Sequence, residues 1–172
     1  DFMASQKTVW KNNSIDHEKG GFLGKRDYFN KIIPNANKGI ILNTRLLWSF
    51  STLQLHNSDY NLKDIAKRSF TYLKDYFQDK VNDGLFWELT AEGKPVQPKK
   101  QIYAQAFGIY SLIEYYKISQ DEEAKEWAIS LFHLIEKYAL DKVENGYIEA
   151  FEKDWSPLTD VRLSEKDMNA EK

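Results

Sequence analysis

The chain has 172 residues, a formal net charge of −2 and charges spread along its length. No basic stripe is present, so we do not expect the chain to bind a nucleic acid. No apolar run is long enough to span a membrane, so we do not expect a membrane partner either. The absence of cysteine excludes a disulfide framework and cysteine-based zinc sites. It also fits a reducing compartment, so we expect a cytoplasmic location.

A short turn motif recurs along the chain and divides it into units. Aspartate and glycine return together, 63 and then 62 positions apart, at Asp16 with Gly21, Asp79 with Gly84, and Asp141 with Gly146. Each motif leads into aromatic or branched residues, which is typical of a turn followed by a short strand. Such self-similarity at a fixed period indicates an internal structural repeat.

Two helices are predicted between consecutive turns. The first of each pair is almost free of charge, over residues 39–55 and 101–116, and a helix that is apolar all round is expected to be buried on every side. The second is amphipathic, over residues 62–77 and 122–138, with one face toward water. Inner and outer helices of this kind either stack as a solenoid or close as an α/α toroid.

A third inner helix is predicted to start near Glu165. Ser164 is followed three residues later by Asp167, a spacing similar to that of a capping box. Helix capping and complementarity to the helix dipole are sufficient reasons for Asp167 and Asn169 at this place. The sequence ends within two turns of the helix start, so we expect a single domain over residues 1–172 with about two and a half helical hairpins.

Arg45 is the strongest candidate for chemistry, because it is the only charge in the first inner helix. A buried guanidinium needs a partner, which is either a structural ion pair or carbonyl clamp, or an anionic group in a central cavity. We place Tyr103 at the corresponding position of the next inner helix, where an aromatic residue either packs in the core or faces the same cavity. Three tryptophans likewise either pack in the core or stack on a sugar ring: Trp48, Trp87 and Trp155.

Other polar residues carry weaker signals. The three histidines have no metal-type partner at ligand spacing, so no metal site is predicted. They are His17, His56 and His133. Three glutamates in the turns are candidates for a carboxylate pair of the glycosidase kind, although the sequence does not fix their separation. They are Glu88, Glu92 and Glu149.

The residues around Arg45 resemble a known family. Residues 43–51, NTRLLWSFS, are similar to the R-x-x-W-x-F-S signature of the N-acylglucosamine 2-epimerase superfamily. Further strings resemble its cellobiose 2-epimerase branch: GLFW at 84–87, KQIYAQAF at 100–107, NGYIEA at 145–150, DW at 154–155 and LSEKDMN at 163–169. The motifs occur in the family's order, and the similarity runs from about Ile15 to the end of the chain.

The resemblance implies an all-α fold, an incomplete part of an (α/α)6 barrel with short hairpin-like loops and a sugar site in its mouth. It implies an isomerase that inverts C2 of the reducing-end glucose or mannose in β-1,4-disaccharides such as cellobiose or mannobiose. One histidine removes the C2 proton, a cis-enediolate forms, and a second histidine returns the proton, with no cofactor and no metal. We therefore assign Arg45 as the catalytic residue that stabilises the enediolate. The substrate-binding residues expected from the resemblance are Tyr103, Trp48, Asp167 and Asn169.

The sequence departs from the family at its end. In the family an N-T-H-x-H string follows the Asp-Met-Asn region, whereas this sequence stops at Lys172. We therefore expect an N-terminal fragment of the barrel that lacks the acid/base histidines and is inactive alone. An open barrel edge would expose apolar surface, which predicts that the fragment self-associates or binds its missing portion.

Two other functions stay open. A glycoside hydrolase of the same fold would use Glu88 and Glu149 as its carboxylate pair. A non-enzymatic helical-repeat binding module would make Arg45 part of a structural ion pair and the aromatic residues plain core. The placement of Arg45 and Tyr103 separates these hypotheses, because a sugar site requires both side chains to point into one concavity.

Overall fold

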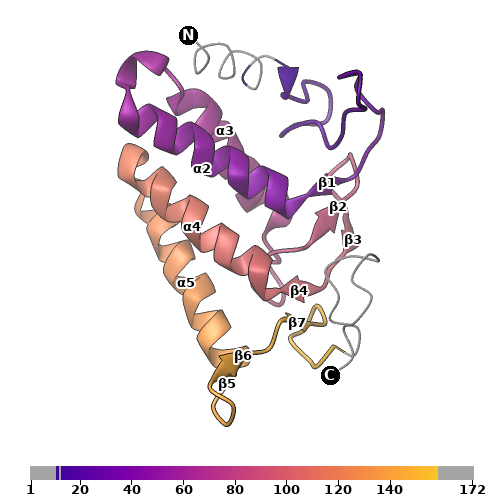
Figure 1. The fold of residues 1–172 in the computed structure, drawn as a ribbon, viewed down its shortest axis with the longest axis vertical. Coiled ribbons are helices and arrows are strands. Elements are labelled where there is room, and N and C mark those ends of the chain that lie inside the picture. The colour runs from indigo at the N-terminus through magenta and orange to yellow at the C-terminus, as the bar shows by residue number, and fades with distance from the viewer. Residues whose placement is uncertain (1–10, 12, 159–172) are drawn as a thin grey trace.

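Two helical hairpins form the main body of the described chain (Figure 1). The computed structural model describes residue 11 and residues 13–158. The hairpins contain α2 (Ile40–His56) with α3 (Lys63–Tyr72), and α4 (Ile102–Ser119) with α5 (Glu122–Tyr138). A 3-10 turn, Ser58–Tyr60, joins α2 to α3. The helices occupy the four predicted segments, except that the end of the predicted outer helix 62–77 is a π-helix, Leu73–Phe77.

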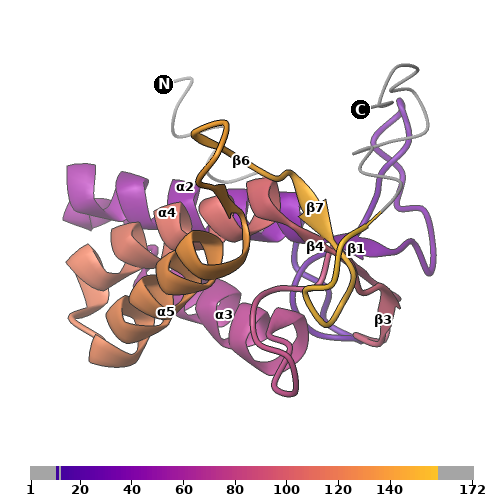
Figure 2. The same ribbon diagram turned by 90° about the horizontal axis from the view of Figure 1, so that it is seen from below.

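The helices are arranged in two layers. α2 and α4 lie side by side in one layer, and α3 and α5 form a second layer behind them (Figures 1 and 2). In α3 the apolar residues Ile65, Ala66 and Phe70 are buried, whereas Lys63 and Lys67 are exposed, as expected of an outer helix. None of the described helices is long and apolar enough to cross a membrane.

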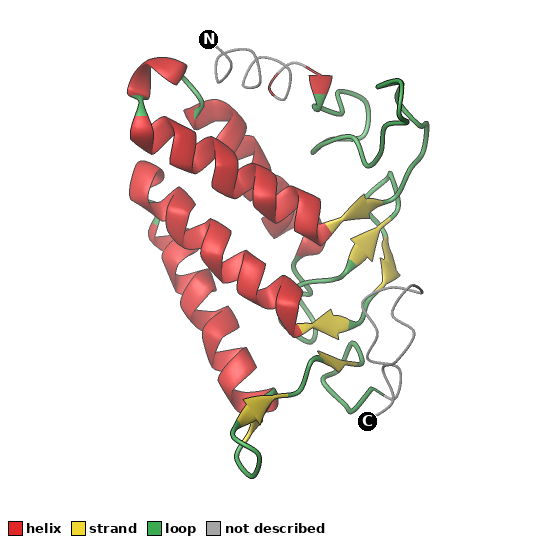
Figure 3. Ribbon diagram, viewed as in Figure 1, coloured by secondary structure: helices red, strands yellow, loops and turns green. Residues whose placement is uncertain are grey.

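Short strands gather at the end of the layers where α2 and α4 begin (Figure 3). The described strands are β1 (Lys38–Gly39), β2 (Glu88–Leu89) and β3 (Pro95–Gln97) in one sheet, β4 (Lys100–Gln101) with β7 (Ala150–Phe151) in another, and β5 (Leu140–Asp141) with β6 (Gly146–Tyr147) in a third. All pairings between these strands are antiparallel. The first two sheets join segments from successive repeats.

The contacts between repeats follow the predicted period. The strand partners shift together by 62 residues, from Lys38 with Leu89 to Lys100 with Phe151. The N–H of Ile40 donates to the carbonyl of Trp87 at 3.1 Å, and the N–H of Ile102 donates to the carbonyl of Glu149 at 2.9 Å. The first backbone donor of each inner helix is therefore satisfied by the repeat that follows it.

The two hairpins share one hydrophobic core. Phe70 of α3 stacks on Tyr115 of α4, with ring centroids 4.7 Å apart, and meets Trp127 of α5 at 6.2 Å. The prediction that the inner helices are buried on every side is wrong for α4, where Tyr103 is 41% and Tyr110 is 52% exposed. α4 packs against α2 and α5, and these tyrosines lie on a part of its surface that the neighbouring elements leave partly exposed.

Candidate functional site

Each inner helix begins beside a buried lysine that is paired with the aspartate of the preceding turn. Lys38 Nζ lies 2.8 Å from Asp16 Oδ2, and Lys100 Nζ lies 2.7 Å from Asp79 Oδ2. The Oδ1 atom of each aspartate accepts two N–H groups of its own turn. The pair ties the turn to the helix start and so fixes the side chains of the first helical turn. Neither lysine was predicted, although the two are 62 residues apart and each stands two residues before a helix that is almost free of charge.

The two aspartates keep their charge. Burial by itself would raise the pKa of Asp79, but the hydrogen bonds from Lys100 and from two backbone N–H groups outweigh it and hold the pKa below its usual value. The pKa of Asp16 is lowered in the same way, against the effect of burial, by Lys38 and the N–H groups of its turn. The two aspartates are therefore ionised and paired, and their role at the helix starts is structural.

An open concavity of about 580 Å³ lies on α2 and α4. It is lined by Arg45, Trp48, Ser49, Ala106, Phe107 and Tyr110. Positions 62 residues apart meet across it. The Arg45 guanidinium carbon lies 5.2 Å from the centre of the Phe107 ring, and Trp48 stacks on Tyr110 with centroids 5.2 Å apart. The counterpart of Arg45 is therefore Phe107, which corrects the assignment of Tyr103, one turn nearer the helix start.

Arg45 is exposed to this concavity and rests on the face of Phe107, in a cation–π contact. Among residues 13–158 it forms no ion pair and no hydrogen bond, so the structural ion pair or carbonyl clamp considered for it is not found there. Its guanidinium presents N–H donors in a planar fork, which suits a charged oxygen of a ligand. The aromatic floor holds this cation in place without neutralising it.

Tyr103 lies on the same side of the helix layer. Its ring centroid is 4.8 Å from that of Phe107, so Phe107 contacts both Arg45 and Tyr103. Tyr103 is not among the residues that line the concavity, so the two predicted site residues are linked only through their shared contact with Phe107. Asp167 and Asn169, like the predicted third inner helix, lie outside the described residues, and their roles stay predictions.

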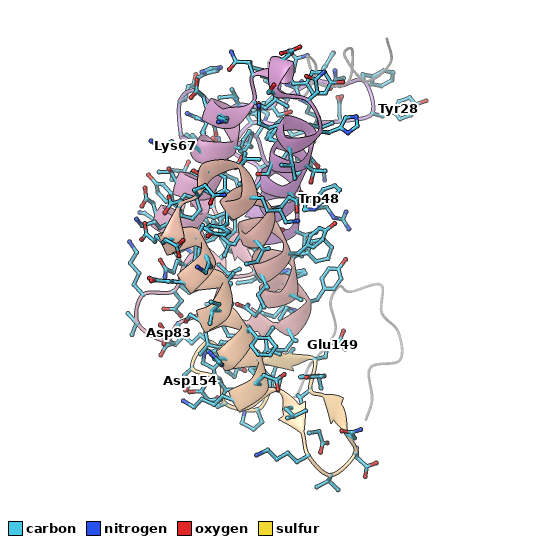
Figure 4. All side chains as sticks on the ribbon, turned by 90° about the vertical axis from the view of Figure 1, so that its left-hand side faces the viewer. Tyr28, Trp48, Lys67, Asp83, Glu149 and Asp154 are labelled. Carbon is cyan, nitrogen blue, oxygen red and sulfur yellow. The ribbon has the colours of Figure 1, made fainter. Side chains whose placement is uncertain are left out.

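Figure 4 shows which side of the layers the labelled residues occupy. Trp48 and Glu149 project from one side, and Lys67 projects from the opposite side. Neither Glu149 nor Glu88 lines the concavity, and Glu92 lies at the surface, 2.6 Å from Lys19. His17, His56 and His133 are all exposed, and none lines it either. Within the part of the chain that the structure describes, no group of three or more His, Cys, Asp or Glu is placed to hold a metal ion.

Comparison with known sequences gives the family. Residues 21–171 match the profile of the N-acylglucosamine 2-epimerase (GlcNAc 2-epimerase) family. The chain belongs to this family. A cellobiose 2-epimerase from Bacteroides fragilis is 40% identical over 163 residues, which are 95% of this chain and 42% of that protein. The chain thus spans about two fifths of the length of this epimerase relative.

Comparison with solved structures gives the fold. The cellobiose 2-epimerase from Bacillus thermoamylovorans B4167 matches with a TM-score of 0.80 at 32% identity, over 95% of this chain and 44% of that one. A sugar epimerase from a ruminal bacterium matches with a TM-score of 0.82 at 34% identity, over 96% and 44%. The two hairpins are part of an α/α toroid, and the predicted family and fold class are both confirmed.

Proposed function

We propose that this chain contributes the Arg45 side of a sugar epimerase site. The enzyme inverts C2 of the reducing-end glucose or mannose of a β-1,4-disaccharide such as cellobiose or mannobiose. The observation that carries the proposal is a cation on an aromatic concave face, with no ion-pair partner among the described residues. This cation stands in the family signature, and the relatives named above support the choice of reaction.

Epimerisation at C2 requires negative charge to build up on oxygen. When a base removes the C2 proton of the open-chain sugar, the electron pair moves toward the C1 carbonyl and an enediolate forms. Arg45 stabilises that oxygen with a fixed positive charge, and removing one donor of this kind costs about 10²–10³ in rate in other enzymes. Tyr103 donates a hydrogen bond to a substrate hydroxyl. Trp48 with Tyr110 offers an apolar ring surface to the sugar.

The proton transfers need general bases on both faces of C2. The three histidines of this chain do not line the concavity, so we expect the chain by itself neither to epimerise a sugar nor to exchange its C2 proton. The proton leaves to one base and returns from another, so the reaction involves no net oxidation and calls for no redox cofactor. Asp167 and Asn169 are proposed to bind the substrate on the strength of the family motif.

The two alternatives receive less support. A glycoside hydrolase would need Glu88 and Glu149 close to the bound sugar, and neither lines the concavity. A helical-repeat binding module would use Arg45 in a structural ion pair, and Arg45 makes none with a described residue.

We also propose that the edge formed by α4 and α5 takes another helical hairpin of the same repeat. Phe70 is only 4% exposed, because Tyr115 and Trp127 of the second hairpin cover it. Phe132 stands 62 residues later on α5 and is 50% exposed, near Ile129 at 46%. The repeat geometry therefore leaves an apolar surface shaped like one that is already covered by a hairpin.

In a solution of this chain alone, a second copy supplies that hairpin. Light scattering should then give a mass that rises with protein concentration, and Phe132→Asp should restore the monomer mass. Lys67→Asp, on the exposed face of α3, is the matched control and should leave association unchanged. A wild-type chain that stays monomeric at all concentrations would contradict this part of the proposal.

The epimerase proposal is tested by C2 chemistry in heavy water. The complete reading frame that contains this chain is expressed beside the chain itself, and cellobiose and mannobiose are followed by NMR for C2 epimers and for deuterium at C2. Both products are expected with the complete frame only. Deuterium uptake by this chain alone would refute the histidine assignment. No exchange by either protein would refute the epimerase and leave the hydrolase and the binding module.

A further inference from the structure

A tight turn with one left-handed residue recurs in all three repeats. The left-handed residues are Asn30, Gly93 and Trp155, with φ of 63°, 87° and 67°. In each turn this residue donates its N–H to the carbonyl three residues earlier, at 3.0 Å. In each turn, the residue at that earlier position also donates its own N–H to the carbonyl of the residue that follows the left-handed one. The three turns are therefore one structural element, repeated at 63 and 62 residues.

Tryptophan is out of place at this position. Glycine adopts a left-handed backbone at no steric cost and asparagine tolerates it, whereas a bulky side chain there is a conformational outlier. Asn30 and Gly93 follow this rule, and Trp155 does not. A strained residue persists only where the surrounding structure over-determines it, so the contacts of the Trp155 side chain must compensate for its backbone.

The indole of Trp155 joins three segments of the chain. Its Nε1–H donates to the carbonyl of Asn82 at 2.8 Å, in the turn between α3 and α4. Its ring stacks on Tyr138 at the end of α5, with centroids 4.9 Å apart and planes at 12°, and meets Phe151 of β7 at 5.9 Å. The ring also closes over Gly84, where an added Cβ would lie 2.8 Å from Trp155 Cζ2. The side chain is only 6% exposed.

The equivalent position in the previous repeat lacks this connection. Gly93 packs directly under Tyr76, which stands 62 residues before Tyr138, and an added Cβ would lie 2.3 Å from the Tyr76 ring. A glycine therefore suffices to make the turn and to pack on the tyrosine of the outer helix. What the tryptophan adds is the reach across to the turn at Asn82.

The hairpin that carries Trp155 supports the start of α4. Its first strand, β7, pairs with β4, and the carbonyl of Glu149 accepts the N–H of Ile102 at 2.9 Å. Tyr103 is the next residue of α4. In Figure 4, Glu149 lies on the side of Trp48, whereas Asp154, beside Trp155 in the chain, lies with Asp83 on the opposite side. The hairpin thus runs from the concave side of the layers to the turn at Asn82, which Trp155 contacts.

We propose that Trp155 is a positioning residue: its indole clamps the hairpin after β7 to the turn at Asn82 and so fixes the start of α4 and the place of Tyr103. The clamp itself is independent of the reaction. Its consequence for a sugar substrate rests on the proposed function, because Tyr103 is a substrate contact only in that proposal.

The clamp is tested by amide hydrogen exchange, with Ile102 as the reporter. Trp155→Gly relieves the backbone strain and removes the indole, and Trp155→Phe keeps a ring and the strain but removes the N–H donor. We expect the Ile102 amide to exchange at least tenfold faster in Trp155→Gly, and by a smaller factor in Trp155→Phe. The Ile40 amide, bonded to Trp87 in the previous repeat, is the matched control and should keep its rate.

Two results would overturn the clamp. One is equal acceleration at Ile40 and Ile102, which would make Trp155 an ordinary core residue. The other is an unchanged Ile102 rate in both variants. If Trp155→Gly does not fold, Trp155→Phe decides by the same comparison.

A kinetic measurement tests the consequence for the site. In the complete reading frame, Trp155→Gly should raise the KM for cellobiose several-fold more than it lowers kcat, and Trp155→Phe should recover part of the loss. Unchanged KM with a loosened Ile102 would overturn the link to Tyr103. If the wild-type protein does not epimerise cellobiose, the proposed function fails, while the exchange experiment still decides the clamp.

Discussion

The two hairpins have the same architecture, yet their outer helices are covered to very different degrees. Phe70 is enclosed by side chains of the second hairpin, whereas Phe132, at the equivalent position, is half exposed. The difference lies in the neighbours, since both residues are phenylalanine on an amphipathic helix. A unit of this fold therefore completes its core with the next unit, as in other repeat proteins whose stability depends on the interfaces between repeats.

The turns preceding the inner helices differ in a second way. Gln105 of α4 accepts the N–H of Leu85 at 2.8 Å and donates to the Leu85 carbonyl at 3.1 Å, so it grips the turn with both ends of its amide. Asn43 occupies the equivalent position on α2 and is one methylene shorter. It donates only to the carbonyl of Gly39, and its buried Oδ1 has no partner within the described structure. The first hairpin is therefore held less tightly to its turn.

The largest expected effect on stability comes from the buried Lys–Asp ion pair that each hairpin has at the start of its inner helix. Lys100→Met leaves the Asp79 charge buried and unpaired, which should lower the free energy of unfolding by about 3–5 kcal/mol. Lys38→Met should cost less, because the Asp16 side chain is 10% exposed and that of Asp79 is 4% exposed. Urea unfolding measures both, with Lys67→Met as the exposed control. Losses no larger than that of the control would show that the lysines do not hold the turns.

The next effect should separate the hairpins. Phe70→Ala removes a ring that is enclosed on both sides and should cost about 3 kcal/mol or more. Phe132→Ala removes a ring that is half in water, and we expect a loss of about 1 kcal/mol. The comparison is made by urea unfolding at a concentration where the chain is monomeric. Equal losses would mean that the second hairpin does not provide the cover over Phe70.

The smallest effect concerns the amide grip. Gln105→Asn should lose the contacts to Leu85 and leave buried polar groups unpaired, at a cost of about 1–3 kcal/mol. The reverse change, Asn43→Gln, should reach the turn of the first hairpin and gain about 0.5–1 kcal/mol. Thermal unfolding of both variants measures this pair of opposite shifts. A loss in both would indicate that the first turn has no room for the longer amide.

The helices and the repeat could be predicted because the patterns that indicate them are visible in the sequence itself. The nearly uncharged run at 101–116 and the amphipathic run at 122–138 each depend on neighbouring residues only, and the Asp–Gly spacing is visible without a structure. The exposure of Tyr103 and Tyr110 could not be predicted, because it depends on which elements stand opposite α4. When a helix is apolar on every side, its sequence does not show which side faces a ligand.

The sequence singled out some of the residues that we propose as the site. Arg45 was singled out by its isolation in an apolar helix, and in the structure both it and Tyr103 contact Phe107. Phe107, which links them, was missed because an aromatic residue in an inner helix looks like core. Trp155 was noted in the sequence as a possible sugar-stacking residue and as part of a family string, but the clamp that we propose for it was not predicted, because its left-handed backbone is a tertiary feature. The sequence indicates a left-handed residue at position 155 only when it is aligned with Asn30 and Gly93, and a tryptophan is not a residue type that suggests this conformation.

The most direct test of the account is the rate of deuterium exchange at C2 of cellobiose, measured with the complete reading frame and its Arg45 variants. Arg45→Ala should lower the rate by about 10²–10³, and Arg45→Lys should recover part of it, since a lysine restores the charge without the planar fork. Lys67→Ala removes an exposed cation from the opposite side of the helix layers and should leave the rate unchanged (Figure 4). Full exchange by Arg45→Ala would contradict the account, because the cation on the aromatic face would then have no part in the chemistry.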